Sequence, residues 1–449
     1  MTDTIYALAS APGRAGVAVV RVSGPQAFDS LAALSDPLPL PDVRMSSLRK
    51  LKNPLTGGSI DEAVVLRFAG PNSFTGEDVV EYHIHGGRAV LDALTAALAR
   101  MPGHRLATGG EFTRRGFENG RMDLTAAEAV ADLIAAETEA QREQALAQMG
   151  GSLSRIYHGW TDRLSKILAH LEADIDFPDE DLPEGIALKL RPSIRQIEFE
   201  IHQHINDGRR GEILREGVRI AVVGAPNAGK SSLVNALAQR DVAIVSDMPG
   251  TTRDVIEVHL NLGGYPVILA DTAGLRPDQI GHSGQAGIEQ EGMRRAIAYA
   301  QSADIVLVLF DGAALPSLDQ HTLKLLDGRC VVYATKADII RGPAPRIRGG
   351  ELATLSAATG QGIDRLISDL ARRVNDIMGA SDRPYLTRSR HREALVHCVD
   401  ALARAQEAML PELVAEDVRL AVRSIGRVTG RVDVEDLLDI IFRDFCIGK

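Results

Sequence analysis

Apolar residues follow several distinct patterns along this chain, and each pattern predicts a different kind of structure. The segments GVAVVRVSG (16–24), EAVVLRFAG (62–70) and DVVEYHIHGG (78–87) are short β-rich runs bounded by Gly or Pro. RAVLDALTAALARM (88–101) then has the apolar periodicity of a helix. We therefore predict that residues 1–120 form a small α/β domain.

The pattern changes twice more along the chain. Helix-forming sequence begins near residue 123 with DLTAAEAVADLIAAETEAQREQALAQM. From residue 218, the near-continuous apolar runs VRIAVVG, PVILA, ADIVLVLF and CVVYA alternate with helical segments, which is typical of a buried parallel sheet. Helical periodicity then returns. The sequence therefore predicts a multidomain chain that combines α/β and all-α parts, with a helical domain (121–212 and 381–449) interrupted by an inserted α/β domain (213–380).

Composition narrows the classes of protein. A chain of 449 residues is too long for one ordinary core. The net charge of −10 argues against a general coat for nucleic acid, although a local basic patch or a basic partner still allows RNA binding. We see no signal-peptide pattern and no apolar run of the roughly twenty residues that span a bilayer. The three cysteines are too widely spaced for a disulfide framework or a metal site, so we expect a cytoplasmic protein without a membrane partner.

A phosphate-binding loop stands between a predicted strand and a predicted helix. The segment GAPNAGKS (224–231) follows RIAVV and precedes SLVNALA. Small residues let backbone N–H groups curl around a β-phosphate at a helix N-terminus. In such loops the lysine, here Lys230, reaches the β- and γ-phosphate oxygens, and the Ser231 hydroxyl holds Mg²⁺. Both flanking elements match this context, so a chance strand–helix turn is the weaker interpretation.

Three further loops indicate guanine rather than adenine. DTAG (271–274) follows PVILA and brings a carboxylate towards Mg²⁺, while TKAD (335–338) follows CVVYA. The Asp338 carboxylate can accept both the N1–H and the exocyclic amine of guanine, and backbone in SAA (356–358) suits the guanine O6. The inserted domain is therefore predicted to be a Ras-like P-loop GTPase domain. Thr335 replaces the usual Asn, which we expect to loosen packing between loops without changing the choice of base.

The segment SDMPGTTRD (246–254) is a candidate switch, and its Thr252 offers a second Mg²⁺ hydroxyl. Many small GTPases place a water-orienting Gln directly after DTAG. This chain has Leu275 there, and a leucine side chain cannot orient water. Another group must perform this role, or hydrolysis of GTP is slow.

Motifs spread over essentially the whole chain resemble one family. They are PGRAGVAVVRVSG, GPNSFTGEDVVEYHIHGG, GEFTRRGFENGRMDLTAAEAVADLI, DFPDE, PGTTRD and the terminal FCIGK. FTGEDVVE with HGG, and the terminal CIGK, are more specific than the GTPase loops, which many families share. On these motifs the chain resembles the MnmE (TrmE) family of tRNA-modification GTPases.

The resemblance implies a homodimer that pairs through N-terminal domains, each of which binds a one-carbon tetrahydrofolate (5-formyl or 5,10-methylene). It also implies G domains that associate when GTP and K⁺ are bound. With a flavin-dependent partner called MnmG (GidA), which supplies the FAD and forms a heterotetramer, such proteins add an aminomethyl or carboxymethylaminomethyl group at C5 of the wobble uridine of certain tRNAs. The GTP site of the family then corresponds to Asn227, Ala228, Gly229, Lys230, Ser231, Ser232, Ser246, Asp247, Met248, Pro249, Gly250, Thr251, Thr252, Asp271, Thr272, Ala273, Gly274, Thr335, Lys336, Ala337, Asp338, Ser356, Ala357 and Ala358.

Carried onto matching positions, the resemblance assigns K⁺ to Asn227 in the phosphate loop and to Ser246, Met248 and Thr251 in the switch. A fixed monovalent cation beside the β- and γ-phosphates can do the work of an arginine finger, because it offsets charge that develops in the transition state. Taken alone, Asn227 is equally consistent with a turn-favouring side chain.

The family orients water with a glutamate in the helix after DTAGLR. Here PDQIGHSGQAG separates that motif from IEQEGMRRA, so the connection is several residues longer than usual. Matching the spacing of Gly292 and Arg295 places the catalytic glutamate at Glu289. A competing register anchored on Gly287 puts Gly284 there and leaves no carboxylate. We predict Glu289; the alternative is a surface glutamate on an amphipathic helix.

The resemblance assigns folate binding to Arg21, Glu81, Arg121 and Lys449. Cations suit a ligand with a glutamate tail, and a carboxylate suits the donor edge of a pterin. Arg121 stands where lysine is common, which keeps the charge and changes the hydrogen-bonding geometry. Without the resemblance, Arg21 and Glu81 are ordinary polar residues of a half-exposed sheet.

Cys446 in the terminal FCIGK is the second candidate catalytic group, after Glu289. A prenylation box is excluded because Gly448 and Lys449 follow the wrong pattern. The resemblance implies that the tail reaches back towards the folate. The thiolate is then a nucleophile or an acid–base group if cations such as Lys449 lower its pKa. Packing without a catalytic role is the other interpretation.

Three other functions compete with wobble-uridine modification. A ribosome-assembly or signalling GTPase shares every GTP loop, but it explains neither the folate-domain motifs nor CIGK. A folate-dependent one-carbon transferase with a merely regulatory G domain differs in where the chemistry occurs. A pure scaffold is disfavoured because the phosphate and Mg²⁺ ligands are complete.

Overall fold

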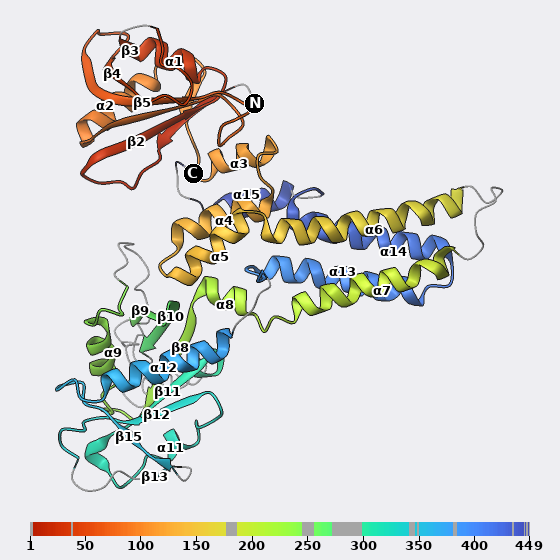
Figure 1. Ribbon diagram of the computed structural model, residues 1–449. Coiled ribbons are helices and arrows are strands. Elements are labelled where there is room, and N and C mark those ends of the chain that lie inside the picture. Colours follow the sequence, from red (N-terminus) through yellow and green to blue (C-terminus); the bar gives the residue numbers. More distant parts are fainter. Residues whose placement is uncertain are drawn as a thin grey trace, which may run out of the picture. The chain divides into compact units, whose positions relative to one another are not determined.

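The computed structural model describes residues 3–36, 39–176, 186–244, 256–271, 299–340, 346–347, 350–379, 384–432, 435–443, 445 and 448. The chain divides into two compact units (Figure 1). The first comprises residues 1–131, 148–198 and 394–449, and the second comprises residues 132–147 and 199–393. Each unit is described by itself.

A mixed seven-stranded sheet forms the N-terminal part of the first unit. Its spatial order is β3-β4-β5-β6-β2-β1-β7, and every neighbouring pair is antiparallel except β1 with β7. The strands are β1 (Thr4–Leu8), β2 (Ala15–Ser23), β3 (Ser35–Asp36), β4 (Ser47–Lys52), β5 (Ser59–Phe68), β6 (Val79–Gly86) and β7 (His104–Leu106). Helices α1 (Ala27–Leu34) and α2 (Arg88–Leu98) share one core with this sheet.

The two faces of this sheet differ because side chains alternate along each strand. Val20 and Val22 of β2 are buried on the face that packs against α1 and α2. On the other face, Leu48, Val64, His83 and Val19 stand opposite one another across four neighbouring strands. Leu48 is 61% exposed and Val64 is 37% exposed, so this row leaves apolar surface open.

Helices make up the rest of the first unit. They are α3 (Glu111–Glu118), α6 (Ser152–Asp176), α14 (Pro411–Thr429) and α15 (Glu435–Arg443), together with parts of α4 (Leu124–Ala135), α5 (Glu139–Met149), α7 (Ile186–Ile205) and α13 (Ser389–Glu407). α6 packs along α14 through buried residues that recur every three or four positions, as an amphipathic helix requires. The Arg191 guanidinium of α7 donates to the Ala408 carbonyl oxygen at 2.7 Å, which joins α7 to the end of α13.

The second unit contains a six-stranded sheet in the order β15-β12-β11-β8-β10-β9. All neighbouring strands are parallel except β9 and β10, which form an antiparallel hairpin. Its strands are β8 (Val218–Gly224), β9 (Ile256–Leu262), β10 (Tyr265–Asp271), β11 (Ile305–Phe310), β12 (Cys330–Ala334) and β15 (Ala353–Thr354). A separate short hairpin pairs β13 (Arg346–Ile347) with β14 (Gly350–Glu351).

Both faces of the six-stranded sheet are covered. One face packs with α9 (Lys230–Ala238) and α12 (Ile363–Met378), and the opposite face holds a second apolar cluster. Every residue of β11 is buried. Burial on both faces explains the near-continuous apolar runs in the sequence, and the predicted fold class is confirmed. The described helices α8 (Arg210–Glu216), η1 (Gly312–Ala314) and α11 (Gln320–Leu323) complete this unit. Among the described residues, every helix is too short or too polar to cross a membrane.

Candidate GTP and folate sites

The predicted phosphate-binding loop connects the end of β8 to the start of α9. Its backbone is left-handed at Asn227 (φ 65°) and at Gly229 (φ 80°), which gives the tight curl that such a loop needs. Gly224 lies so close to the carbonyl oxygen of Leu309 that a Cβ atom would collide with it. The Lys230 ammonium donates to the carbonyl oxygens of Gly224 (2.9 Å) and Ala225 (3.0 Å). The lysine therefore folds back over its own loop.

Parallel strands bring the other GTP motifs to the same edge of the sheet. β8, β10 and β12 end at Gly224, Asp271 and Ala334, and the strand pairings place these ends side by side. Thr335, which follows β12, is 3% exposed. Its side chain faces Gly229, since a Cβ atom on that glycine would lie 3.6 Å from the Thr335 Cβ. The segment with the predicted base contacts thus touches the phosphate loop.

The two predicted guanine loops are joined by backbone hydrogen bonds. The Ala337 N–H donates to the Leu355 carbonyl oxygen at 2.9 Å, which ties the Thr335–Asp338 segment to the loop that begins at Ser356. Asp338 is exposed and Ser356 is fully buried. The Lys336 ammonium forms an ion pair with the Asp311 carboxylate at 2.8 Å.

Several predicted site residues lie outside the described residues. They are Ser246, Asp247, Met248, Pro249, Gly250, Thr251, Thr252, Thr272, Ala273, Gly274, Glu289, Cys446 and Lys449. Asp271 is described only as the last backbone position of β10. Ser231 and Ser232 are exposed at the start of α9, and Ala228 is buried within the loop.

Arg21 and Glu81, both assigned to folate, stand directly opposite each other on β2 and β6. The Arg21 Nη2 lies 2.9 Å from the Glu81 Oε1, and the side chains are 14% and 17% exposed. The Arg21 guanidinium also lies over two aromatic rings, 5.4 Å from the centroid of Phe74 and 5.7 Å from that of Phe112. This cation is therefore held by one carboxylate and two ring faces.

Arg121 reaches the same region from the end of α3. Its Nε donates to the Ser73 carbonyl oxygen at 3.2 Å. Ser73 precedes Phe74, whose ring contacts Arg21. The structure thus brings three of the four predicted folate residues around one loop of the N-terminal sheet.

The described part of the C-terminal tail packs on the same domain. Phe445 contacts Phe442 with ring centroids 5.3 Å apart, and both side chains press against Gly110. Gly448 adopts a left-handed φ of 102°, and a Cβ atom there would collide with the carbonyl oxygen of Leu8. Leu8 neighbours Ala7, the residue that pairs with Arg21 in the β1–β2 ladder. The tail therefore returns to the sheet that carries Arg21.

Comparison with known proteins decides the family. A profile described as "GTP-binding protein TrmE N-terminus" matches residues 4–121, and one described as "MnmE helical domain" matches residues 124–446. The chain belongs to the MnmE family of tRNA modification GTPases.

Individual relatives span the whole chain. It is 52% identical over 459 aligned positions to the tRNA modification GTPase MnmE of Parvibaculum lavamentivorans, covering 100% of both chains. It is 51% identical to the tRNA modification GTPase MnmE of Paramagnetospirillum magneticum, again over 100% of both. A human relative, the mitochondrial 5-taurinomethyluridine tRNA synthase subunit GTPB3, is 44% identical over 99% of this chain and 93% of its own.

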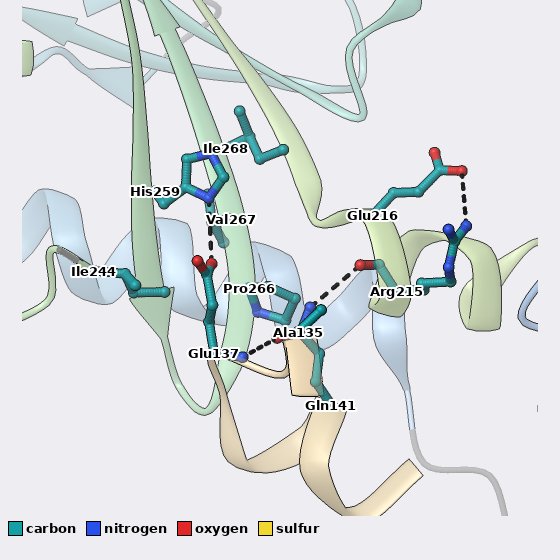
Figure 2. Close-up of a pocket in the computed structure, with 10 residues that line it drawn as sticks. All are labelled: Ala135, Glu137, Gln141, Arg215, Glu216, Ile244, His259, Pro266, Val267 and Ile268. Carbon is teal, nitrogen blue, oxygen red and sulfur yellow. Dashed lines mark hydrogen bonds and ion pairs between the residues drawn. The ribbon is translucent and has the colours of Figure 1, made fainter. Parts of the chain in front are cut away.

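Two contacts link the β9–β10 hairpin to residues 132–147. The His259 Nδ1 lies 3.3 Å from the Glu137 Oε2, and the Ala140 N–H donates to the Gly264 carbonyl oxygen at 3.3 Å. Figure 2 shows the His259 and Glu137 side chains on the wall of a cavity of about 200 Å³, together with Gln141, whose Nε2 donates to the Arg215 carbonyl oxygen at 3.2 Å. The hairpin connects the residues just after the predicted switch to those just before TAG.

Sequence reasoning missed several residues of this MnmE family member's N-terminal domain. Phe74, Phe112, Glu77 and Arg115 were passed over within the quoted motifs NSFTGED and GEFTRRGFENG. An arginine is normally exposed, so a fully buried Arg115 gives no signal in an apolar pattern. Only the density of glycine and aromatic residues in these two motifs hinted at a packed loop.

Proposed function

We propose that this chain is a K⁺-activated GTPase whose nucleotide cycle governs modification of C5 of the wobble uridine in certain tRNAs. It does so with a one-carbon tetrahydrofolate and the flavoprotein MnmG, in a cytoplasmic heterotetramer. The observation that carries the proposal is the full-length relationship to MnmE proteins, together with a human relative whose name states uridine modification. The rival ribosome-assembly or signalling function explains only the GTP loops.

At the nucleotide site, Lys230 would leave the carbonyl oxygens of its own loop and contact the β- and γ-phosphates. Ser231 stands exposed at the first turn of α9, where Ser and Thr hydroxyls hold Mg²⁺ in P-loop proteins. Asp338 is exposed at the edge of the same sheet and suits the donor edge of guanine. Mg²⁺ held by the Ser231 hydroxyl would neutralise charge on the phosphates.

Potassium is the proposed activator. Asn227 is exposed at the left-handed turn of the phosphate loop, and its amide oxygen is a suitable ligand for a hard cation. Ser246, Met248 and Thr251 would complete the site. The test compares GTP hydrolysis in KCl and NaCl for wild type and Asn227→Ala, and we expect the K⁺ advantage to disappear in the variant.

Glu289 is the proposed water-orienting residue. Steady-state GTP hydrolysis in KCl should fall about 100-fold in Glu289→Ala with nucleotide affinity retained. Glu291→Ala is the matched control, because it removes a carboxylate two positions away in the same sequence. If both variants turn over like wild type, Glu289 has no catalytic role; if only Glu291→Ala is slow, the register is wrong.

The first unit is the proposed folate-binding and dimerising part. The Arg21–Glu81 pair offers a cation for a glutamate tail and a carboxylate for a pterin edge, and Phe74 and Phe112 border it. Arg121, Lys449 and Cys446 would reach the ligand from α3 and from the tail. Because the row of Leu48, Val64 and Val19 leaves apolar surface on the open face, a second copy of the chain is its proposed occupant.

The proposal as a whole is tested by reconstitution. Protein, MnmG with FAD and NADH as the hydride donor, tRNA, GTP, MgCl₂, KCl, a one-carbon tetrahydrofolate, and ammonium or glycine as the nitrogen donor are combined, and the wobble nucleoside is identified by mass spectrometry. Omission of any component should abolish the new nucleoside. Cys446→Ser separates the two roles of the thiol: loss of modification with GTP hydrolysis intact makes the thiol chemical, and retention of both makes it a packing residue. An unmodified tRNA in the complete mixture overturns the proposed function.

A further inference from the structure

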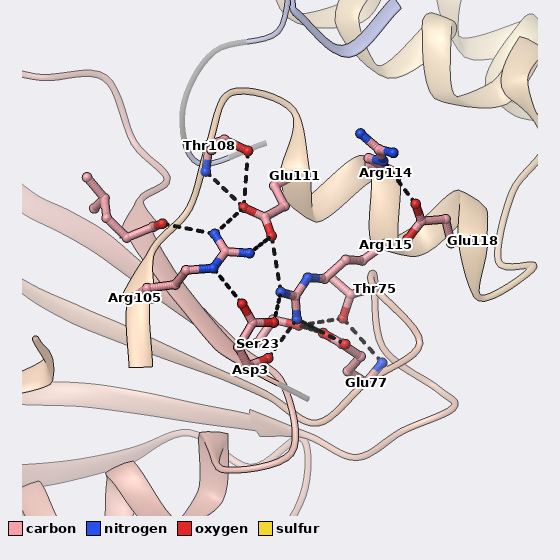
Figure 3. Close-up of polar contacts among 11 residues, drawn as sticks. Asp3, Ser23, Thr75, Glu77, Arg105, Thr108, Glu111, Arg114, Arg115 and Glu118 are labelled. Carbon is pink, nitrogen blue, oxygen red and sulfur yellow. Dashed lines mark hydrogen bonds and ion pairs between the residues drawn. The ribbon is translucent and has the colours of Figure 1, made fainter. Parts of the chain in front are cut away.

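A cluster of charged side chains surrounds the buried Arg115 behind the proposed folate site. Arg115 is 0% exposed, and its guanidinium meets three carboxylates, at 2.9 Å from Asp3, 3.1 Å from Glu77 and 3.1 Å from Glu111. Arg105 contributes a second guanidinium, which contacts both Asp3 and Glu111. Figure 3 shows the two arginines converging on these carboxylates. The cluster joins the start of β1, the loop before β6, and α3.

The loop Pro71–Glu77 is fixed by this cluster and by a ring of hydrogen bonds. The Ser23 hydroxyl donates to the Glu77 carboxylate at 2.7 Å and lies 2.7 Å from the Thr75 hydroxyl. The Glu77 N–H donates to that same threonine oxygen at 3.2 Å, which closes the ring. Asn119 of the α3 end donates to the Thr75 carbonyl oxygen at 2.7 Å. Every one of these bonds comes from a side chain or backbone group that is at least partly buried.

The same loop carries Phe74 to the face of the sheet where Arg21 lies. Phe112, the other ring under the Arg21 guanidinium, is the second residue of α3, the helix that carries Arg115. Both rings therefore take their positions from elements that Arg115 ties together. A shift of either element would move Arg21 away from Glu81 or expose it to water.

We propose that Arg115, Glu77 and Ser23 are positioning residues for the folate site: they hold the Pro71–Glu77 loop so that Phe74 and Arg21 present a fixed surface to the ligand. This inference rests on the proposed function. A buried ion cluster is a poor source of stability, since well-packed apolar residues of similar size often stabilise a fold as well or better. It does fix a geometry, because every charge must keep its partners.

The experiment uses two serines that share the same chemistry. Ser23 is 0% exposed and Ser30 is 1% exposed, and each hydroxyl makes two hydrogen bonds. Ser30 lies on α1 and contacts Ala27 and Tyr82, on the opposite face of the sheet from the loop. Ser23→Ala and Ser30→Ala should therefore lower thermal stability to a similar extent. Only Ser23→Ala should weaken binding of 5-formyltetrahydrofolate to the full chain, by about tenfold in titration calorimetry.

A kinetic readout separates positioning from catalysis. In the reconstituted modification reaction, Ser23→Ala should raise the KM for folate and leave kcat nearly unchanged. Arg115→Lys should have a larger effect in the same direction, because one ammonium cannot serve three carboxylates in the geometry of a guanidinium. If Arg115→Lys fails to fold, Ser23→Ala still decides the question.

The outcomes distinguish the inference from the proposed function. Wild-type protein that binds no tetrahydrofolate overturns the folate role itself. If wild type binds and Ser23→Ala binds equally well, the loop is not a positioning element and the folate role stands. Equal loss of affinity in Ser23→Ala and Ser30→Ala would show a general effect of destabilisation, and that also overturns the inference.

Discussion

The two sheets of this molecule place their chemistry in different ways. In the mostly parallel six-stranded sheet both faces are covered, so the candidate GTP residues lie at the carboxyl ends of β8, β10 and β12. In the N-terminal sheet one face is open, so Arg21 and Glu81 project from the middle of strands. The first candidate site depends largely on the backbone conformation of loops, and the second depends on side chains held by their neighbours. The two sites should therefore respond independently to substitution.

The largest expected effect comes from the phosphate loop. Lys230→Ala should reduce kcat/KM for GTP about 1,000-fold, since it removes a cation from the phosphates in the transition state. Binding of 5-formyltetrahydrofolate by the same variant should match wild type, because the lysine belongs to the second unit. Steady-state kinetics and titration calorimetry check both statements. A parallel fall in folate affinity would show that the sites are coupled and break the comparison.

The stability of the N-terminal sheet should depend on pH through Glu111, and that of the six-stranded sheet should not depend on this residue. Burial raises the pKa of Glu111, but hydrogen bonds from Arg105, the Thr108 N–H and Arg115 outweigh it and lower the pKa to about 2, from an ordinary value of 4.5. The lowered pKa means that this carboxylate stabilises the fold above pH 4.5 and loses its contribution as the pH falls towards 2. The charged groups around it are Asp3, Arg105 and Arg115, with Glu77 on the far side of Arg115.

Glu111→Gln should accordingly cost about 3 kcal/mol at pH 7, because it leaves the buried Arg115 guanidinium short of a partner. The difference from wild type should shrink as the pH drops below 4.5. Hydrogen exchange of the β1 and β2 amides, corrected for intrinsic exchange rates, measures this difference in stability between the variant and wild type. Amides of β8 and β11 serve as the internal control. A difference that persists unchanged at pH 3 would contradict the role assigned to the carboxylate.

A smaller effect is expected at the folate surface itself. Arg21→Met keeps an unbranched side chain between Phe74 and Phe112 and removes the charge, so folate affinity should fall about tenfold. GTP hydrolysis should be unchanged. Titration calorimetry and a GTPase assay on the same preparation provide the test, and an unaltered folate affinity would remove Arg21 from the site.

The smallest expected effect concerns Thr335, which contacts the phosphate-binding loop. The Thr335 hydroxyl donates a hydrogen bond to the Phe310 carbonyl oxygen at 3.2 Å. The side chain makes only van der Waals contact with Gly229. Thr335→Asn would extend an amide towards the phosphate loop. Dissociation of a fluorescent GDP analogue should then slow about threefold, because the added contact contributes less free energy than one full hydrogen bond. A faster release would mean that the larger side chain strains the loop.

The difference between the two sheets also explains what the sequence alone could predict. Apolar runs and Gly-rich loops identified the parallel sheet and its order of motifs, because buried strands and tight turns demand particular residue types at particular positions. The Arg21–Glu81 pairing required knowledge of the β2–β6 register, which an alternating pattern does not specify.

The burial of Arg115 was beyond sequence reasoning for a related reason. Glu111 is four positions away on the same helix, a spacing equally typical of an exposed ion pair, and the other partners Glu77 and Asp3 are 38 and 112 positions away, so no local pattern predicts the burial. Glu289 and Cys446 stay predictions, since they lie outside the described residues.

The β9–β10 hairpin has a mechanical consequence. Its two strands are joined by seven residue pairs, so it is a stiff rod about 24 Å long at 3.4 Å per residue. One end of the hairpin continues in sequence into the predicted switch on one side and the predicted DTAG loop on the other, and the turn at the other end is hydrogen-bonded to Ala140. A rod of fixed length converts a tilt at one end into a proportional displacement at the other. A displacement of the Ile256 and Asp271 end of the hairpin would therefore be transmitted to its contact with Ala140 in residues 132–147.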